Sequence, residues 1–366
     1  MDRSIRIHFL PMWQSHHAAT SGYGQFIRYL DGNIISRDRK WKLWERAVSR
    51  AFRNVYENSG SYWYHRESFL AEFEAARRWF RGRNEIFHFL YGEQCFRFLG
   101  SIKKLSRRNF IVCTYHTPPD KFGEVVKTPR HIGDVDAAIV LSKMQIECLS
   151  RYVDREKIHY VPRGVDTRYF KPGAGKGNGR LECLFVGNFL RDFDTMSKAA
   201  SLLEDNGRIR FTVVTLPRNR GHFDRNRNVE VLSGIPDSRL LELYQNSDVL
   251  VLPLLDATAN NVVVEAMACG VPVVTTDLPN AGDYLDERCS RLVPPGNPQK
   301  LAETILMLER DRTLLNEMSA ACRDQALGFS LEETARKTYE VYEAVLKNGQ
   351  NSPAMNAVKG RASHAC

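Results

Sequence analysis

The sequence has no long hydrophobic run. No apolar stretch approaches the roughly 18 residues that a membrane-spanning helix needs, which argues against an integral membrane protein. Its first residues, MDRSIRIHFLPMW, have no continuous apolar stretch behind the basic residues, so we expect no signal peptide. The eight cysteines form no C-x-x-C pair, and several lie in apolar runs, as Cys113 and Cys183 do. This pattern favours reduced, buried thiols in a cytoplasmic protein over a disulfide framework or a zinc site.

A phosphate-binding loop is also absent, although the segment KPGAGKGNGR (171–180) contains a Gly-Lys pair. Phe170 stands where the first glycine of such a loop should be, and Gly177 follows Lys176 where Ser or Thr is required. The four glycines among polar residues instead predict a flexible connector between two domains.

The length of 366 residues suits two domains of similar size. We expect an N-terminal domain over 1–170, the hinge over 171–180 and a C-terminal domain over 181–347. The last helix is able to pack back on the N-terminal domain. The tail 348–366 should be disordered.

Both predicted domains alternate strands and helices. Short apolar runs without polar alternation, such as FIVCTY and DVLVLPL, predict parallel strands covered on both faces by helices. The predicted fold class is therefore α/β, with two Rossmann-like doubly wound domains facing across a cleft.

The charge is unevenly distributed. Residues 1–175 contain 30 Lys and Arg against 18 Asp and Glu, whereas the remainder contains 22 against 25. An anionic partner of the first half is one interpretation, and a solvated basic face without a partner is the other. No nucleic-acid-binding module is present, so we expect no nucleic acid partner.

The segment RDRKWKLWERAVSRAFR (37–53) has one apolar helical face, made by Trp41, Trp44, Val48 and Phe52, with seven basic residues around it. Such a helix is typical of peripheral contact with an anionic membrane. The alternative is an amphipathic helix that packs on the N-terminal sheet with its arginines in water.

The stretch 248–285 carries the most chemical information. A buried strand is followed by the polar loop DATANN and by a helix that begins near Asn261. The free backbone N–H groups at the start of such a helix favour the binding of a phosphate group. Glu265 lies on this helix between apolar neighbours, so its carboxylate needs a partner such as sugar hydroxyls, or else a nearby Arg or Lys.

Together these motifs resemble the retaining glycosyltransferases of family four, which have the GT-B fold. The resemblance covers almost the whole chain apart from the tail, is strongest after residue 157 and is weak between 31 and 84. The motifs that carry it, in chain order, are SGYG, CTYHTPP, VPRGVDTRYF, LFVGNFLRDFDT, SGIPDSRLLELYQNSDV and EAMACGVPVVTTD.

The resemblance implies that Glu265 holds the ribose of a nucleotide sugar donor. A second glutamate of the family, eight residues earlier, would fall at Ala257, so the usual contact to the donor sugar is in doubt. Asp256 could replace it by a small shift of the loop. Otherwise Thr258, Asn260 and Asn261 are the polar groups left.

The resemblance also implies that Arg191, after Gly187, neutralises the leaving diphosphate, which needs positive charge or N–H donors when no metal is present. The alternative for Arg191 is a surface pair with Asp192 or Asp194. Ile235 matches the region whose backbone holds the base.

In the first half, Gly22 and Gly24 match a glycine-rich turn that lets the backbone approach the donor phosphates. His116, just after the strand FIVCTY, matches a histidine beside the transferred sugar. Each of these three residues has an alternative interpretation as an ordinary loop residue.

Two acidic triplets, DVD (134–136) and DFD (192–194), invite comparison with metal-binding Asp-x-Asp motifs. DVD precedes a strand and DFD opens a helix, where aspartate caps are common, so we expect neither a metal nor another cofactor.

The sequence thus predicts a metal-independent retaining hexosyltransferase that uses a nucleotide diphosphate sugar. The acceptor is unknown, possible classes being a lipid or an anionic glycan, and the expected location is the cytoplasm or the inner face of the membrane. The alternatives are a non-catalytic nucleotide-sugar-binding protein and a GT-B nucleotide-sugar epimerase.

Overall fold

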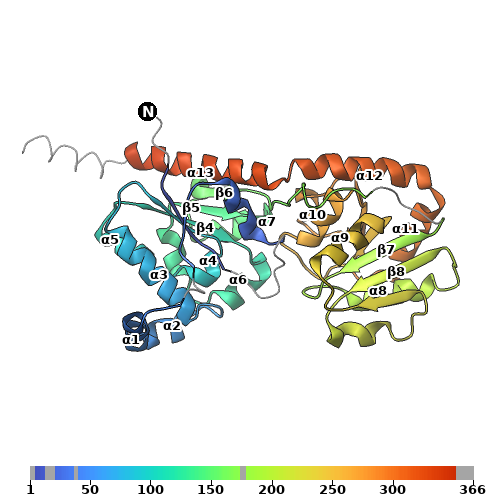
Figure 1. Ribbon diagram of the computed structural model, residues 1–366, viewed down its shortest axis with the longest axis horizontal. Helices are drawn as coiled ribbons and strands as arrows, with labels where there is room; N and C mark the ends of the chain where they lie inside the picture. Colours follow the sequence, from blue (N-terminus) through green and yellow to red (C-terminus); the bar gives the residue numbers. More distant parts are fainter. Residues whose placement is uncertain (1–4, 13–20, 37–39, 174–178, 352–366) are drawn as a thin grey trace, which may run out of the picture. The chain divides into compact units, whose positions relative to one another are not determined.

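The computed structural model describes residues 5–12, 21–36, 40–173 and 179–351, which form two compact units (Figure 1). The N-terminal unit contains residues 5–12, 334–351 and the described part of 26–161. The C-terminal unit contains residues 21–25 and the described part of 162–333. Within the described residues the chain therefore changes unit at 25–26, at 161–162 and again at 333–334. The predicted hinge at 171–180 stays a prediction, and residues 174–178 lie outside the described residues.

The N-terminal unit is built on one parallel six-stranded sheet. Its core strands are buried along their whole length, as apolar runs without alternation predict. The strand order is β2 (Asn33–Ile34), β1 (Ile7–Leu10), β3 (Ile86–Phe89), β4 (Phe110–Tyr115), β5 (Ala137–Val140) and β6 (Ile158–Tyr160). The helices are α1 (Leu43–Ala51), α2 (Arg53–Glu57), α3 (Arg66–Trp79), α4 (Gly92–Cys95), α5 (Leu99–Leu105), α6 (Pro119–Val125) and α7 (Met144–Leu149), with 3-10 turns η2 (Pro129–Asp134) and η3 (Arg155–Lys157).

The C-terminal unit has a second parallel six-stranded sheet. Its order is β12 (Ser290–Val293), β11 (Val273–Thr276), β10 (Val249–Leu252), β7 (Leu181–Val186), β8 (Ile209–Val214) and β9 (Val229–Leu232). Read from β9, this is the 3-2-1-4-5-6 order of dinucleotide-binding folds. The order reverses between β7 and β10, which lie side by side in the sheet.

Helices cover both faces of this sheet because right-handed crossovers leave β7 and β10 in opposite directions. Accordingly α8 packs with α11, and α10 packs with α12. The bounds are α8 (Phe193–Leu202), η4 (Pro217–Phe223), α9 (Asp237–Asn246), α10 (Asn261–Ala268), η5 (Ala281–Asp283), α11 (Pro298–Arg310) and α12 (Arg312–Leu327).

Helix α13 (Leu331–Asn351) begins in the C-terminal unit and continues in the N-terminal one. There Tyr342 lies 2.6 Å from Nδ1 of His88 on β3, and Nε2 of His88 lies 2.8 Å from the hydroxyl of Thr114 on β4. All three side chains are buried. This polar contact fixes the second half of α13 against the N-terminal sheet.

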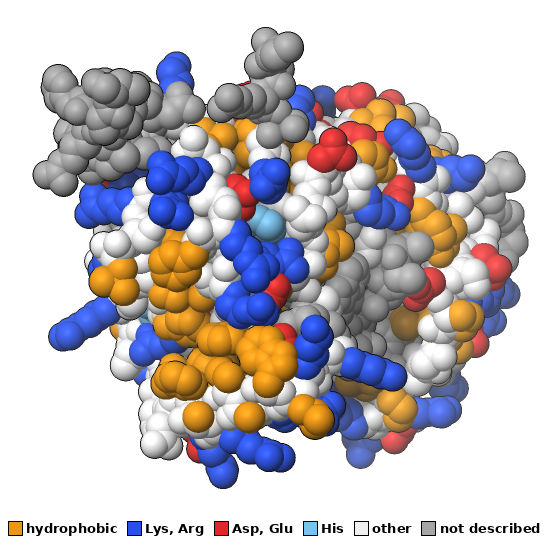
Figure 2. Space-filling model, turned by 60° about the vertical axis from the view of Figure 1, so that its left-hand side comes forward, with side chains coloured by type: hydrophobic (Ala, Val, Ile, Leu, Met, Phe, Trp, Pro, Cys, Tyr) orange, Lys and Arg blue, Asp and Glu red, His pale blue; other side chains and the backbone are white. Residues whose placement is uncertain are grey.

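The amphipathic segment 37–53 forms α1 and the start of α2, and residues 37–39 lie outside the described part. Its apolar face contacts α3: Trp44 lies 6.4 Å from Phe73, and Phe52 stacks on Phe69 at 6.0 Å between ring centroids. The arginines of α1 remain exposed. Packing within the protein is therefore confirmed, with the partner being α3 rather than the sheet. Figure 2 shows hydrophobic side chains gathered among Lys and Arg on one face of the molecule.

The described cysteines are thiols rather than disulfides, and all except Cys148 are buried. The expectation of buried thiols is confirmed for this part of the chain. No helix in the described ranges is both long and apolar enough to cross a bilayer.

Candidate functional site

The loops that follow β7 and β10 meet where the strand order of the C-terminal sheet reverses. Arg191 pairs with Leu254 in an antiparallel bridge, and the backbone N–H of Asp192 donates to the carbonyl of Pro253 at 3.0 Å. Helices leave the sheet on opposite faces at such a point, so the ends of the two strands are open to a ligand. Most of the predicted donor-binding residues lie here.

Arg191 is held by its own loop and by the start of α10. Its guanidinium donates to the carbonyls of Val186 and Phe189, each at 3.0 Å, and to Oδ1 of Asn260 at 3.3 Å. Burial lowers the pKa of Arg191 to about 10, so the side chain is still positively charged at neutral pH. A cation fixed by neutral acceptors keeps its charge for an incoming anion.

The surface-pair interpretation of Arg191 is wrong. No carboxylate in the part of the chain that the structure describes lies within ion-pair distance of it. Asp192 instead caps α8 by accepting from the backbone N–H of Thr195 at 2.9 Å, and Asp194 pairs with Lys198 at 2.7 Å.

Gly187 makes room for this guanidinium. Its φ is +114°, and a Cβ at this position would lie 2.6 Å from Nη2 of Arg191. A side chain would clash there and would also adopt a strained backbone conformation. The glycine after β7 is thus required by the position of Arg191.

Helix α10 begins beside Arg191. The side chain of Asn260 accepts from the backbone N–H of Val262 at 3.1 Å and so caps the helix. Asn261 is the first helical residue. In the preceding loop Thr258 is buried, and its hydroxyl has no hydrogen-bond partner. The backbone N–H groups at the start of α10 therefore lie close to the guanidinium of Arg191.

Glu265 is buried on α10, with only 4% of its surface exposed. Ser21 donates to Oε1 at 2.5 Å, and the hydroxyl of Tyr244 donates to Oε2 at 3.0 Å. Burial raises the pKa of Glu265, while these two hydrogen bonds lower it in part. No Arg or Lys of the described ranges lies within ion-pair distance, so the alternative of a simple ion pair is wrong.

Gly22 and Glu265 line one narrow cavity of the C-terminal unit, together with Ser21, Asn261 and Gly164. Gly22 has a φ of +116°, as a glycine-dependent turn requires. Gly24 lies close by in the 3-10 turn η1 (Tyr23–Tyr29), and Ile235 is half-buried against the core of the same unit. Gly22 and the predicted ribose-binding residue Glu265 thus line the same cavity.

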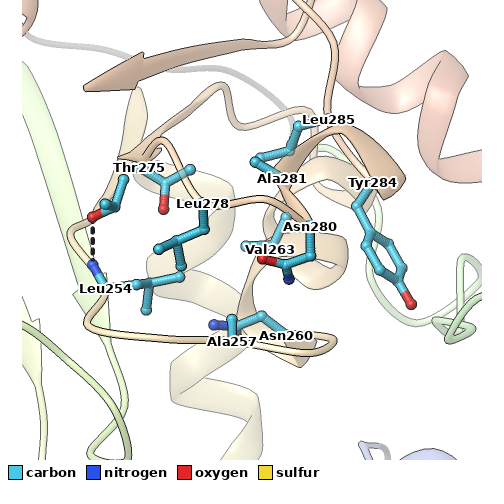
Figure 3. Close-up of a pocket in the computed structure, with 11 residues that line it drawn as sticks. Leu254, Ala257, Asn260, Val263, Thr275, Leu278, Asn280, Ala281, Tyr284 and Leu285 are labelled. Atoms are coloured by element: carbon cyan, nitrogen blue, oxygen red, sulfur yellow. Dashed lines mark hydrogen bonds between the residues drawn. The ribbon is translucent and has the colours of Figure 1, made fainter. Parts of the chain in front are cut away.

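A second cavity, of about 30 Å³, lies behind the loop that precedes α10. Figure 3 shows Ala257 and Asn260 on one side of it and Leu278, Asn280 and Ala281 on the other. Asn280 braces the loop by donating to the carbonyl of Thr258 at 2.9 Å.

His116 lies in the N-terminal unit, directly after β4. Its ring stacks on Tyr91 with the centroids 4.1 Å apart, and Nε2 lies 2.7 Å from the carbonyl oxygen of Leu90. The buried carboxylate of Glu93 accepts from the backbone N–H groups of His116 and Thr117 at 2.8 and 2.9 Å. The ring is therefore held in a defined position at the carboxyl edge of the sheet.

Sequence reasoning missed Ser21, Tyr244 and Glu93. Ser21 stands in the SGYG motif, but only the glycines of that motif were singled out. Tyr244, on helix α9, lies in the motif SGIPDSRLLELYQNSDV, of which only Ile235 was singled out. Glu93, on helix α4, lies in no such motif.

The acidic triplets have other partners. Asp134 and Asp136 pair with Lys104 and Lys103, each at 2.7 Å, and DFD opens α8 as expected. Within the described ranges no group of three or more His, Cys, Asp or Glu side chains could hold a metal ion. Metal independence stays a prediction.

The two parallel sheets, the second with the strand order of dinucleotide-binding folds, define an α/β protein. Residues 180–311 match the family described as Glycosyl transferases group 1. Over 219 residues the chain is 27% identical to a D-inositol 3-phosphate glycosyltransferase of Nocardia farcinica, which covers 53% of this chain and 49% of that protein. The chain spans about half the length of the curated relatives it matches.

Two solved structures share the fold. Sucrose-phosphate synthase of Thermosynechococcus elongatus has a TM-score of 0.70 at 15% identity, covering 94% of this chain and 100% of that chain. Anabaena HepE in complex with UDP-glucose has a TM-score of 0.66 at 13% identity, covering 93% and 100%. The resemblance to glycosyltransferases and the GT-B fold are therefore confirmed.

Proposed function

We propose that the chain is a retaining, metal-independent glycosyltransferase that moves a hexose from a nucleotide diphosphate sugar to an acceptor. The observation that carries the proposal is a half-buried arginine without an acidic partner in the described chain, Arg191, beside the start of α10. This arrangement suits a group that gains negative charge as it leaves, because fixed N–H donors stabilise charge without reorganising.

Each residue of the site has a proposed role. Arg191 and the N–H groups at Asn261 bind the leaving diphosphate, Gly22 lets the backbone approach it, and Glu265 accepts hydrogen bonds from the ribose. His116 lines the pocket of the transferred sugar. No side-chain nucleophile is assigned, so the acceptor attacks from the face that the nucleotide leaves, and the leaving phosphate takes the acceptor's proton.

A phosphorylated polyol is the acceptor class to test first. The relative from Nocardia farcinica is named for D-inositol 3-phosphate. The excess of Lys and Arg in residues 1–175 suits an anionic acceptor of this kind.

Peripheral contact with an anionic membrane remains a separate proposal. It is supported by Leu43 and Phe52, whose surfaces are 83% and 50% exposed, next to the exposed Arg46 and Arg50. Sedimentation with phosphatidylserine vesicles tests it: the wild type should bind, and the double variant Leu43→Ser, Phe52→Ser should not. Equal sedimentation of both would contradict it.

The experiment for the main proposal measures transfer from UDP-, GDP- and ADP-hexoses to D-inositol 3-phosphate and to other phosphorylated polyols. A new glycoside is the expected product, and Glu265→Ala should lose most or all of the activity. Near-normal transfer by that variant would contradict the assignment. Binding without turnover favours the non-catalytic alternative, which is motivated by Ala257, and a changed sugar nucleotide without acceptor favours the epimerase.

A further inference from the structure

Among the described residues, none accepts a hydrogen bond from the guanidinium of the buried Arg163. Only 7% of its surface is exposed, and its Nε is buried and unpaired. In the described chain neither a carboxylate nor a carbonyl accepts from its side chain. Its backbone N–H does have a partner, the hydroxyl of Tyr284 at 2.9 Å.

Such an arrangement is costly unless something else supplies the acceptor. A guanidinium stays charged in proteins, and burial of a charge without a partner is destabilising. Arg323 of the same unit shows the usual structural solution, because it donates to the backbone carbonyls of Phe170, Ala268 and Thr167. In the described residues, no backbone carbonyls accept hydrogen bonds from Arg163 in this way.

The position of Arg163 connects it to the donor site. The next residue, Gly164, lines the narrow cavity that Glu265, Ser21 and Asn261 also line. The positive charge of Arg163 is one of the causes that lower the pKa of Glu265. The carboxylate of Glu265 is not a hydrogen-bond acceptor for Arg163. Its two hydrogen bonds come from Ser21 and Tyr244.

We propose that Arg163 binds an oxyanion of the donor, either its diphosphate or a carboxylate on its sugar. The proposal rests on the proposed function, because it assumes that a nucleotide diphosphate sugar binds beside α10. Both oxyanions offer the paired oxygen acceptors that a guanidinium recognises. Arg163 is then a second cation of the donor site, in addition to Arg191.

The test compares Arg163→Gln with the matched control Arg168→Gln. Arg168 belongs to the same segment, but its side chain is exposed and pairs with Glu332. Binding is measured by calorimetry for UDP, GDP and ADP. The tightest binder is then compared with its nucleoside and with its glucose and glucuronic acid conjugates.

If the diphosphate is the ligand, Arg163→Gln should bind the nucleoside diphosphate about tenfold more weakly, with nucleoside affinity unchanged. If a sugar carboxylate is the ligand, the wild type should prefer the glucuronic acid conjugate to the glucose conjugate, and only Arg163→Gln should lose that preference. Arg168→Gln should match the wild type in both cases.

The melting temperatures of the ligand-free proteins test whether Arg163 has only a structural role. Removal of an unpaired buried charge should leave the melting temperature of Arg163→Gln equal to that of the wild type or higher. A lower melting temperature with equal losses for nucleoside and nucleoside diphosphate would overturn the inference. So would unchanged affinities in Arg163→Gln while the wild type binds nucleotide. If the wild type binds none of the three nucleotides, the proposed function itself fails.

Discussion

Ser21 and Glu265 are 244 positions apart in the chain, yet the hydroxyl of Ser21 donates to the carboxylate of Glu265 at 2.5 Å. Both belong to the C-terminal unit, because residues 21–25 are part of it although they precede most of the N-terminal unit. The candidate donor site is thus assembled from two distant stretches of sequence.

Replacing Ser21 by Ala should move the acidic limit of donor binding to higher pH. The Ser21 hydroxyl lowers the pKa of Glu265 against the larger, raising effect of burial, so its loss raises that pKa further. A hydrogen bond to a charged group contributes about 1.5–3 kcal/mol, so its loss should be measurable in the pH dependence of binding. Donor affinity measured from pH 4.5 to 8 checks this. Ser238→Ala, at an exposed position of α9, is the control, and identical profiles for both variants would contradict the role given to Glu265.

Replacing Gly187 by Ala should destabilise the protein and weaken donor binding together. The added Cβ would lie 2.6 Å from Arg191, at a φ of +114°, and strain of this kind costs about 1–3 kcal/mol. Gly207→Ala is the control, because no atom lies within 4 Å of its added Cβ. Urea unfolding and donor titration of both variants measure the effect. Donor affinity that is kept in Gly187→Ala would mean that Arg191 does not need its observed position.

Replacing Asn260 by Asp should separate stability from binding. Aspartate caps a helix as well as asparagine does, so the free energy of unfolding should change by less than about 1 kcal/mol. The new carboxylate would pair with Arg191 and repel the diphosphate, so donor affinity should fall about tenfold or more. Asn260→Ser keeps a capping group without the charge and should bind the donor more tightly than Asn260→Asp. Equal affinity of the two variants would contradict the account.

Burial of His88 should make the protein less stable in acid. Burial lowers the pKa of His88 from 6.5 to about 3, so between these values the unfolded chain binds a proton that the folded chain does not. The stabilisation is complete above pH 6.5 and is lost as the pH falls toward 3, at a rate near 1.4 kcal/mol per pH unit. The free energy of unfolding from pH 4 to 7 should therefore fall less steeply in His88→Gln than in the wild type. A variant of the exposed His222 should keep the wild-type slope, and a wild-type slope in His88→Gln would contradict the prediction.

The sequence predicted the long strands well because their signal is local. Apolar runs such as FIVCTY became fully buried strands. Gly187 and Asn260 came from the resemblance to a known family, and both lie in loops at the carboxyl ends of parallel strands. Strand β2 was missed, since it has only two exposed residues, and β12 was missed because only its two end residues are buried. Neither contains an apolar run.

The contacts of Glu265 could not be predicted in the same way. No periodicity relates Ser21 to Glu265, and Tyr244 differs in no local feature from a core tyrosine. The helix at 37–53 shows a related difficulty, because one apolar stripe suits a lipid surface and the neighbouring helix α3 equally. The ring contacts of Trp44 with Phe73 and of Phe52 with Phe69 show the packing on α3, which no pattern in the sequence specifies.

The most direct test of the central claim is the affinity of UDP, GDP and ADP for the wild type and for Arg191→Gln, each with Mg²⁺ and with EDTA. The account predicts that the wild type binds one of these nucleotides equally well in both conditions, and that Arg191→Gln binds it about ten- to a hundredfold more weakly. Affinity that is unchanged in Arg191→Gln, or that disappears with EDTA, would contradict it.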